Sequence, residues 1–148
     1  MSYPIAVLAA LEPLVREGRS RYRRDDGHRP RVLLVEDNAL GLRSAARLLR
    51  TEFEVTAVAN GEAALLRFAR GDFDVVVTDY QMPAMTGIEL LEQIRVRDPH
   101  VRRVLMSGGS IPGLDGYIGS GIVEHCLQKP MDLRAELWAF LSGVAKPS

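Results

Sequence analysis

The sequence predicts an α/β fold in which helices cover both faces of a parallel β-sheet. Short apolar segments alternate along the 148-residue chain with longer segments of helical periodicity, a pattern typical of right-handed βαβ units. The apolar segments are nearly continuous, as in Val75-Val76-Val77, and such runs fit strands that are buried on both faces of a sheet. We therefore expect a doubly wound, five-stranded parallel sheet.

Turn and capping residues delimit the individual elements. Strands are predicted at 31–36, 53–58, 73–78, 101–106 and 123–128, and helices at 39–51, 61–70, 87–97 and 132–144. Asn38 and Asn60 are N-cap residues for the first two helices. Thr86 and Glu89 form a capping-box pattern at the start of the third. The last helix carries an apolar stripe of Leu133, Leu137, Phe140 and Leu141.

One predicted helix is weak. Residues 108–121, between the fourth and fifth strands, contain six glycines and one proline. Each glycine inside a helix costs about 1 kcal/mol relative to alanine. We expect a short or irregular fourth helix here.

Composition limits the class of protein. The apolar fraction is 47%, and no apolar run approaches the roughly 20 residues that span a bilayer. Cys126 is the single cysteine, which fits a reducing, cytoplasmic environment. The formal net charge is zero, so we expect neither membrane association nor direct contact with nucleic acid.

The first thirty residues differ from the rest. Residues 2–17 could form a short amphipathic helix, and residues 18–30 are a polar linker that contains several arginines. We therefore divide the chain into an N-terminal extension, 1–30, and one domain, 31–145. The apolar stripe of the extension needs burial, against the domain or in a homodimer.

Polar residues follow four of the predicted strands. They are the pair Glu36-Asp37, then Asp79, Ser107 and Lys129. Because the carboxyl ends of parallel strands meet at one edge of the sheet, we expect these side chains to converge there. Clustered carboxylates repel one another and favour a cation, and a lysine beside them suits a phosphoryl group. The pattern predicts a divalent cation and a phosphoryl group held on a carboxylate.

These residues, in this order and at these spacings, resemble the receiver domain of response regulators in two-component signalling (the CheY-like domains). The resemblance covers about residues 30–145. It implies the flavodoxin-like strand order 2-1-3-4-5. It fits either a stand-alone receiver or one that belongs to a hybrid histidine kinase.

The resemblance implies roles for the acidic residues. Asp79 would be both the phosphoacceptor and a metal ligand. Asp37 would bind the metal directly, Glu36 directly or through water, and the backbone carbonyl of Gln81 would complete the protein's share of the ligands. Oxygen ligands of this kind suit Mg²⁺, with Mn²⁺ as an alternative.

The remaining site residues are assigned in the same way. Lys129 and Ser107 would bind the phosphoryl group, and Gly108 would leave room for it. In this family the bond before Pro130 is usually cis. The loop after the phosphoacceptor would be shaped by Met82, Pro83 and Gly87.

Cys126 departs from the family pattern. Its position usually holds Phe or Tyr, which turns inward during activation, and a cysteine is too small to repeat that motion fully. We expect a buried, inert thiol, with a redox role as the alternative.

The resemblance implies a phosphoacceptor that takes a phosphoryl group from a phosphohistidine on a histidine kinase or histidine phosphotransfer protein. It would signal to an unidentified downstream protein through protein contacts and would not act as an enzyme on external substrates. Two alternatives are a small phosphatase with Asp79 as nucleophile and a receiver-fold scaffold that is not phosphorylated. The phosphatase needs a second acid where Gln81 stands. The intact set of site residues argues against the scaffold.

Overall fold

A single parallel sheet organises the chain. The structure, a computed structural model, describes residues 29–129 and 132–143. Five strands pair in the order β2-β1-β3-β4-β5, which confirms the predicted order and fold class. The strands are β1 (Arg31–Val35), β2 (Glu54–Val58), β3 (Val75–Asp79), β4 (Arg102–Ser107) and β5 (His125–Gln128).

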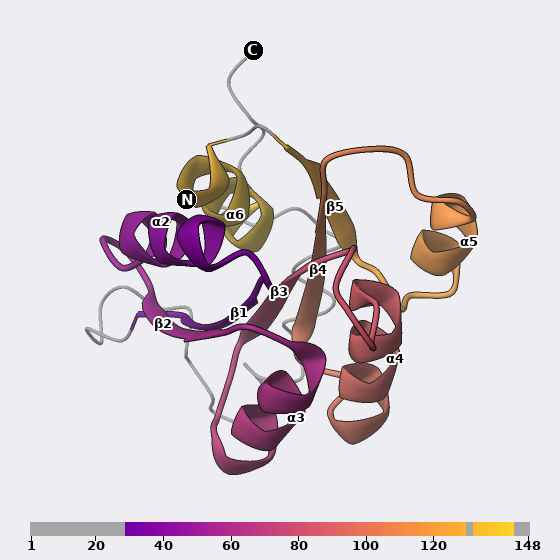
Figure 1. Ribbon diagram of the computed structural model, residues 1–148, viewed down its shortest axis with the longest axis horizontal. Coiled ribbons are helices and arrows are strands. Elements are labelled where there is room, and N and C mark those ends of the chain that lie inside the picture. The colour runs from indigo at the N-terminus through magenta and orange to yellow at the C-terminus, as the bar shows by residue number, and fades with distance from the viewer. Residues whose placement is uncertain (1–28, 130–131, 144–148) are drawn as a thin grey trace.

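Helices cover both faces of this sheet. They are α2 (Ala39–Leu49), α3 (Gly61–Arg70), α4 (Gly87–Arg97), α5 (Leu114–Gly119) and α6 (Leu133–Ser142). Figure 1 shows α2 and α6 on one face and α3, α4 and α5 on the other. The helix expected at 2–17, most of the linker after it (residues 18–28) and Pro130 lie outside the described residues. The last two linker residues are described, and the carbonyl of Pro30 accepts from the Glu54 amide at 3.0 Å.

Alternation along the strands divides the core into two apolar layers. Leu33, Val76 and Leu105 face α3 and α4, whereas Val32 and Val77 belong to the layer under α2 and α6. All five side chains are completely buried. Burial of each such side chain contributes about 1.5–3 kcal/mol, so the sheet is a rigid support for the groups at its edges.

The capping residues expected from the sequence are present. Asn38 and Asn60 each accept a hydrogen bond through Oδ1 from a backbone amide of the helix they precede, both at 2.8 Å. Thr86 and Glu89 form the reciprocal capping box of α4. These bonds satisfy amides that have no partner inside the helix, and they set where α2, α3 and α4 begin.

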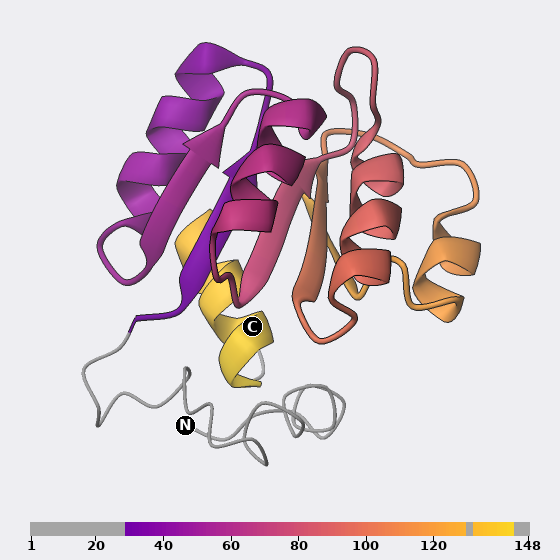
Figure 2. The same ribbon diagram turned by 90° about the horizontal axis from the view of Figure 1, so that it is seen from below.

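The helix α5 is short, as predicted for the glycine-rich segment. It has six residues, none of them buried, and starts after Gly113, whose φ is +74° and which provides no side-chain cap. Figure 2 shows α5 at the end of the row of helices on its face, next to α4. Its C-terminal end is tethered, because Arg95 Nη1 donates to Ser120 O at 2.6 Å.

Two buried arginines at the start of β4 were not expected. Arg102 and Arg103 are 3% and 5% exposed, and both contact the carboxylate of Glu124. The Arg103 guanidinium also donates to the carbonyls of Pro99, Val101, Gly121 and Ile122. Burial lowers the pKa of Arg103, and the Glu124 charge opposes that shift. Arg103 therefore provides hydrogen-bond donors for carbonyls of two loops, and these carbonyls have no partner in the sheet.

A histidine is also partly enclosed by the fold. His125, on β5, is half-buried and stacks on Phe140 with 4.9 Å between ring centroids. The guanidinium of Arg102 lies 4.6 Å from the centre of the same ring. Burial lowers the pKa of His125, so its neutral form packs here.

We expect Arg103→Met to destabilise the fold by about 3–5 kcal/mol, because it leaves buried loop carbonyls without their donor and removes one of the two cations that contact the Glu124 carboxylate. Urea denaturation would measure the loss. Arg43→Met, at an exposed position on α2, is the matched control and should change the free energy of unfolding by less than about 0.5 kcal/mol. Equal effects of the two substitutions would contradict a supporting role for Arg103.

Candidate phosphoacceptor site

The polar residues predicted to converge do so at the carboxyl edge of the sheet. The ammonium nitrogen of Lys129 lies 3.0 Å from Oε1 of Glu36 and 3.4 Å from Oδ2 of Asp79. Glu36 directly follows β1, Asp79 is the last residue of β3, and Lys129 directly follows β5. The lysine thus bridges two carboxylates that the sheet brings together from distant parts of the chain.

The position of Lys129 is fixed by its backbone. Its amide donates to the carbonyl of Ser107 at 2.8 Å, which extends the pairing of β4 and β5 by one residue. Burial disfavours the charged ammonium, but the hydrogen bond to Glu36 and the charge of Asp79 outweigh this effect, and the pKa of Lys129 is raised. The lysine therefore stays protonated at neutral pH.

An open cavity lies beside the phosphoacceptor candidate. Asp37, Tyr80, Gln81, Met82, Pro83 and Thr86 line a volume of about 420 Å³. Tyr80 and Gln81 directly follow Asp79, whose side chain is 14% exposed. Asp37 and Gln81 are exposed, so water, a cation or a phosphoryl donor has access to this edge of the sheet.

The donors here fit a magnesium ion of the kind that keeps much of its water. In the part of the chain that the structure describes, no three His, Cys, Asp or Glu side chains form a group that could itself enclose a metal. The Glu36 carboxylate is directed at Lys129. Mg²⁺ is commonly held by only one or two carboxylates plus water and phosphate oxygens. Asp37 and Asp79 supply that number.

Gly87 has a steric reason to be glycine. A Cβ at this position would overlap the carbonyl oxygen of Asp79 and lie 2.8 Å from Cδ1 of Leu105. The Gly87 amide donates to the carbonyl of Tyr80 at 2.9 Å. The start of α4 is therefore packed against the backbone of Asp79, and this close approach leaves no space for a side chain.

The loop between Asp79 and α4 is tightly folded. Met82 is buried and accepts a hydrogen bond from the Thr78 hydroxyl through its sulfur at 3.8 Å. Pro83 O accepts from the Met85 amide at 2.7 Å, and Ala84 between them has a φ of +67°. The residues Met82 and Pro83 thus lie where the sequence indicated, in the loop that leads away from Asp79.

Ser107 is engaged in a local turn. Its hydroxyl donates to the Gly109 carbonyl at 2.7 Å and accepts from the Gly109 amide at 3.1 Å. It is 4% exposed at the end of β4. A Cβ at Gly108 would meet no atom within 4 Å, so there is open space beside the serine. To bond a group on Asp79, the hydroxyl would have to exchange its bonds with Gly109.

Cys126 lies on β5, half-buried against the apolar layer beneath α4 and α5. Its register partner on β4 is Leu105. Burial raises the pKa of its thiol, so the unreactive protonated form predominates at neutral pH.

Sequence reasoning missed the direct pair between Glu36 and Lys129. Glu36 was considered only as a metal ligand, but the longer glutamate side chain reaches the lysine. Gly41 provides the necessary space: a Cβ there would lie 3.0 Å from Oε1 of Glu36, so the glycine lets the carboxylate lie against α2.

Comparisons with known proteins agree with this geometry. Residues 32–139 match the family model described as the response regulator receiver domain. The chain is 39% identical over 109 residues to the response regulator protein FleR of Pseudomonas aeruginosa. This alignment covers 72% of this chain and 23% of FleR. It is 34% identical over 99 residues to the hydrogenase transcriptional regulatory protein HoxA of Cupriavidus necator, covering 66% of this chain and 20% of HoxA.

A solved structure gives the same result. The signal receiver domain of an HD domain-containing protein from Pseudomonas fluorescens superimposes with a TM-score of 0.69 at 28% identity, covering 76% of this chain and 91% of that domain. The chain belongs to the response regulator receiver domain family, the signalling domains of two-component systems. It spans 23% and 20% of the lengths of FleR and HoxA. In the described residues, no helix has both the length and the apolar character to cross a membrane.

We expect Gly87→Ala to destabilise the protein by about 1–3 kcal/mol, because the new methyl group forces α4 away from the Asp79 carbonyl. Thermal or urea unfolding would measure this. Gly116→Ala is the matched control within a helix, since a Cβ there meets nothing within 4 Å and should stabilise by about 0.5–1 kcal/mol. Equal effects at the two glycines would show that contact with Asp79 is not what requires Gly87.

Proposed function

We propose that Asp79 accepts a phosphoryl group from a phosphohistidine donor, with Mg²⁺ or Mn²⁺ as the cation. The observation that supports this most directly is the lysine ammonium 3.4 Å from Oδ2 of Asp79, beside an open cavity that Asp37 and Gln81 line. The chain's membership of the receiver family is independent support.

In the proposed reaction, a carboxylate oxygen of Asp79 attacks phosphorus. The bond between phosphorus and the donor's imidazole nitrogen breaks, and its electron pair stays on that nitrogen. The product is an acyl phosphate on Asp79. Such transfer needs mainly positioning and charge stabilisation. Asp37, Asp79 and the Gln81 carbonyl would hold the cation, which supplies positive charge to the phosphoryl oxygens.

Lys129 supplies the second positive charge. In the structure its ammonium divides between Glu36 at 3.0 Å and Asp79 at 3.4 Å. A phosphoryl group on Asp79 carries more negative charge than the carboxylate it replaces, so the ammonium would shift toward it and away from Glu36. Glu36 then acts as the resting partner that keeps the lysine charged and in place.

The same charge would change the segment after β4. The Ser107 hydroxyl would exchange its hydrogen bond to Gly109 for one to a phosphoryl oxygen. This movement would displace residues 108–113, which precede the short, weakly packed α5. Phosphorylation would shift the population of conformers of α5 and of the neighbouring surface of β5 and α6. With Cys126 in place of an aromatic residue, we propose that movement of α5 replaces the motion of a ring.

The proposed partners follow from this chemistry. Receiver domains interact with histidine kinases, and a kinase or phosphotransfer protein would provide the phosphohistidine. A downstream protein would recognise the altered face without direct contact to nucleic acid. A homodimer through the N-terminal segment, and the domain boundaries 1–30 and 31–145, remain predictions. The phosphatase alternative finds no support, because the exposed Gln81 provides no second acid.

We expect acetyl phosphate with Mg²⁺ to add one phosphoryl group to the parent protein and none to Asp79→Asn, which removes the nucleophile but keeps the shape. Intact-protein mass spectrometry reads out the added mass. Excess EDTA should abolish the addition if the cation is needed to neutralise the transferred group.

The matched control is Asp115→Asn, which makes the same substitution at an exposed position in α5. It should be labelled like the parent protein. Full labelling of Asp79→Asn would place the phosphoacceptor elsewhere. Undiminished labelling in EDTA would contradict the role of the cation but not that of Asp79.

A further inference from the structure

A second cavity lies at the opposite edge of the sheet. It has a volume of about 320 Å³ and is lined by Arg31, Glu54, Thr56, Arg67, Arg70, Gly71, Asp72 and Phe73. These residues come from the starts of β1 and β2, from the last turn of α3 and from the connection to β3. The cavity is therefore remote from Asp79, which is at the carboxyl ends of the strands. Its volume is at the lower end of the range for small-molecule sites.

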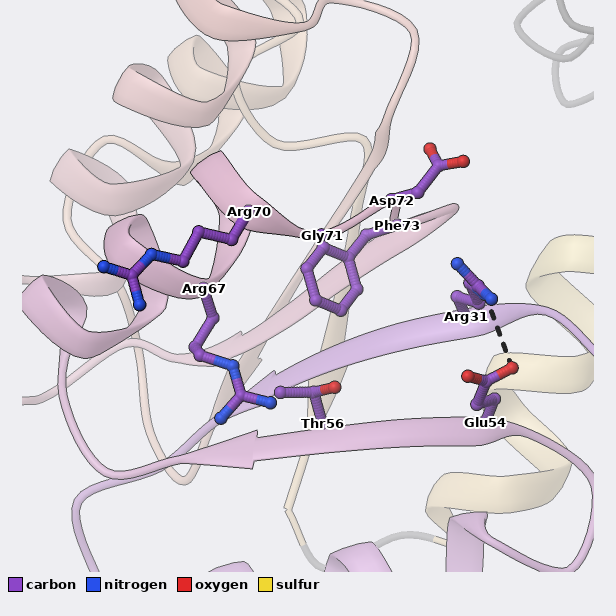
Figure 3. Close-up of a pocket in the computed structure, with 8 residues that line it drawn as sticks. All are labelled: Arg31, Glu54, Thr56, Arg67, Arg70, Gly71, Asp72 and Phe73. Atoms are coloured by element: carbon purple, nitrogen blue, oxygen red, sulfur yellow. Dashed lines mark ion pairs between the residues drawn. The ribbon is translucent and has the colours of Figure 1, made fainter.

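Positive charge around this cavity is incompletely neutralised. Arg31 pairs with Glu54 at 3.4 Å, across the register of β1 and β2. Within the described part of the chain, neither Arg67 nor Arg70 forms an ion pair with a carboxylate. Figure 3 shows Arg67 reaching from α3 toward Thr56, with Arg70 at the rim and the Asp72 carboxylate turned away from Arg67. Two guanidinium groups thus remain for an external anion.

The floor of the cavity is formed by packed residues. The Phe73 ring is 8% exposed and stacks with Phe68 at a centroid distance of 6.1 Å. A Cβ at Gly71 would come within 2.6 Å of the Phe73 ring, so the absence of a side chain at 71 lets the ring lie close under the end of α3. Thr56 is half-buried and paired in register with the fully buried Leu33. Arg67 and Arg70 therefore line the same cavity as an apolar surface, the ring of Phe73, and a hydroxyl group, that of Thr56.

We propose that this cavity binds a small organic dianion, whose phosphate or carboxylate groups are held by Arg67 and Arg70 while its carbon frame rests on Phe73 and Thr56. The planar guanidinium group matches both kinds of oxyanion through paired N–H donors. Two charges on the ligand balance Arg67 and Arg70, for which residues 29–129 and 132–143 provide no ion-pair partner. Binding would be independent of the phosphoryl chemistry at Asp79.

The simpler explanation is that Arg67 and Arg70 only complement the dipole at the C-terminal end of α3. Arg47 has the same place in the last turn of α2 but does not line the cavity. The substitutions Arg67→Gln and Arg47→Gln remove the same charge and separate the two explanations. If the cavity binds the anion, only Arg67→Gln should weaken anion binding. If the charge matters only in general, the two substitutions should have equal effects.

The test is calorimetric titration of the full chain with phenyl phosphate and, separately, with succinate, each of which is an organic dianion near neutral pH. Protein and buffers are freed of divalent ions with a chelating resin beforehand, so that no divalent ion can carry either probe to Asp79. We expect one site for at least one probe, and the better probe identifies phosphate or carboxylate as the preferred group. Arg67→Gln should weaken binding by about tenfold or more, through loss of a charge-assisted hydrogen bond. Arg47→Gln and Asp79→Asn should leave the affinity unchanged.

Melting temperatures of the variants verify that each is folded, and both arginines are exposed, so folding should be retained. Failure of the parent protein to bind either probe would overturn the proposal. So would equal weakening by Arg67→Gln and Arg47→Gln, which would indicate a general effect of charge. Loss of binding in Asp79→Asn would place the anion at the phosphoacceptor edge and also overturn it.

Discussion

The bridge from Lys129 to Glu36 and Asp79 is the interaction on which the site depends. Two carboxylates with little exposure stand at the ends of neighbouring strands, and without a cation their mutual repulsion would drive them apart. The ammonium provides the compensating charge. Its position depends on the register of β5 against β4, because the Lys129 amide is bonded to Ser107. Sheet pairing therefore sets the electrostatics of the site.

The two sides of the site differ in how firmly they are held. On one side, α4 begins directly against the Asp79 carbonyl, and only a glycine at position 87 allows this contact. On the other side, the segment after Ser107 has open space beside Gly108 and Gly109, contacts the core through the buried Ile111, and leads to α5, which buries none of its residues. A new charge on Asp79 would therefore act on two different surroundings. The start of α4 is closely packed against Asp79, whereas α5 is weakly packed. Local opening is easiest where few apolar contacts oppose it, so we place the conformational response at α5.

Much of the fold could be predicted because its signals are local. Apolar runs located the strands, and Asn38, Asn60 and Thr86 located three helix starts. Topology then required Glu36, Asp79 and Lys129 to meet, since the carboxyl ends of parallel strands share one edge. The strand limits were less accurate. The strand predicted from residue 73 starts at Val75, although the Asp74 amide already donates to the Arg31 carbonyl at 2.9 Å and its carbonyl accepts from the Arg102 amide at 3.0 Å.

Other features depend on partners that no local pattern reveals. Arginines are usually found at the surface, but Arg102 and Arg103 are buried because Glu124, far along the chain, pairs with both. Arg103 also donates to the carbonyls of Gly121 and Ile122. The preference of Glu36 for Lys129 depends on side-chain length and on the space that Gly41 leaves. The charged cavity beside β2 is likewise a product of shape, because its arginines, threonine and aromatic ring come from separate elements.

The central claim is that the carboxylate of Asp79 carries the phosphoryl group, and the most direct measurement identifies the modified side chain itself. The protein would be treated with acetyl phosphate and Mg²⁺, and borohydride would then reduce the acyl phosphate to an alcohol, which converts the aspartate to homoserine. Peptide mass spectrometry would locate the converted residue. Our account predicts homoserine at position 79 alone and only after phosphorylation. Homoserine at another aspartate, or a phosphoryl group that resists reduction on a serine or histidine, would contradict it.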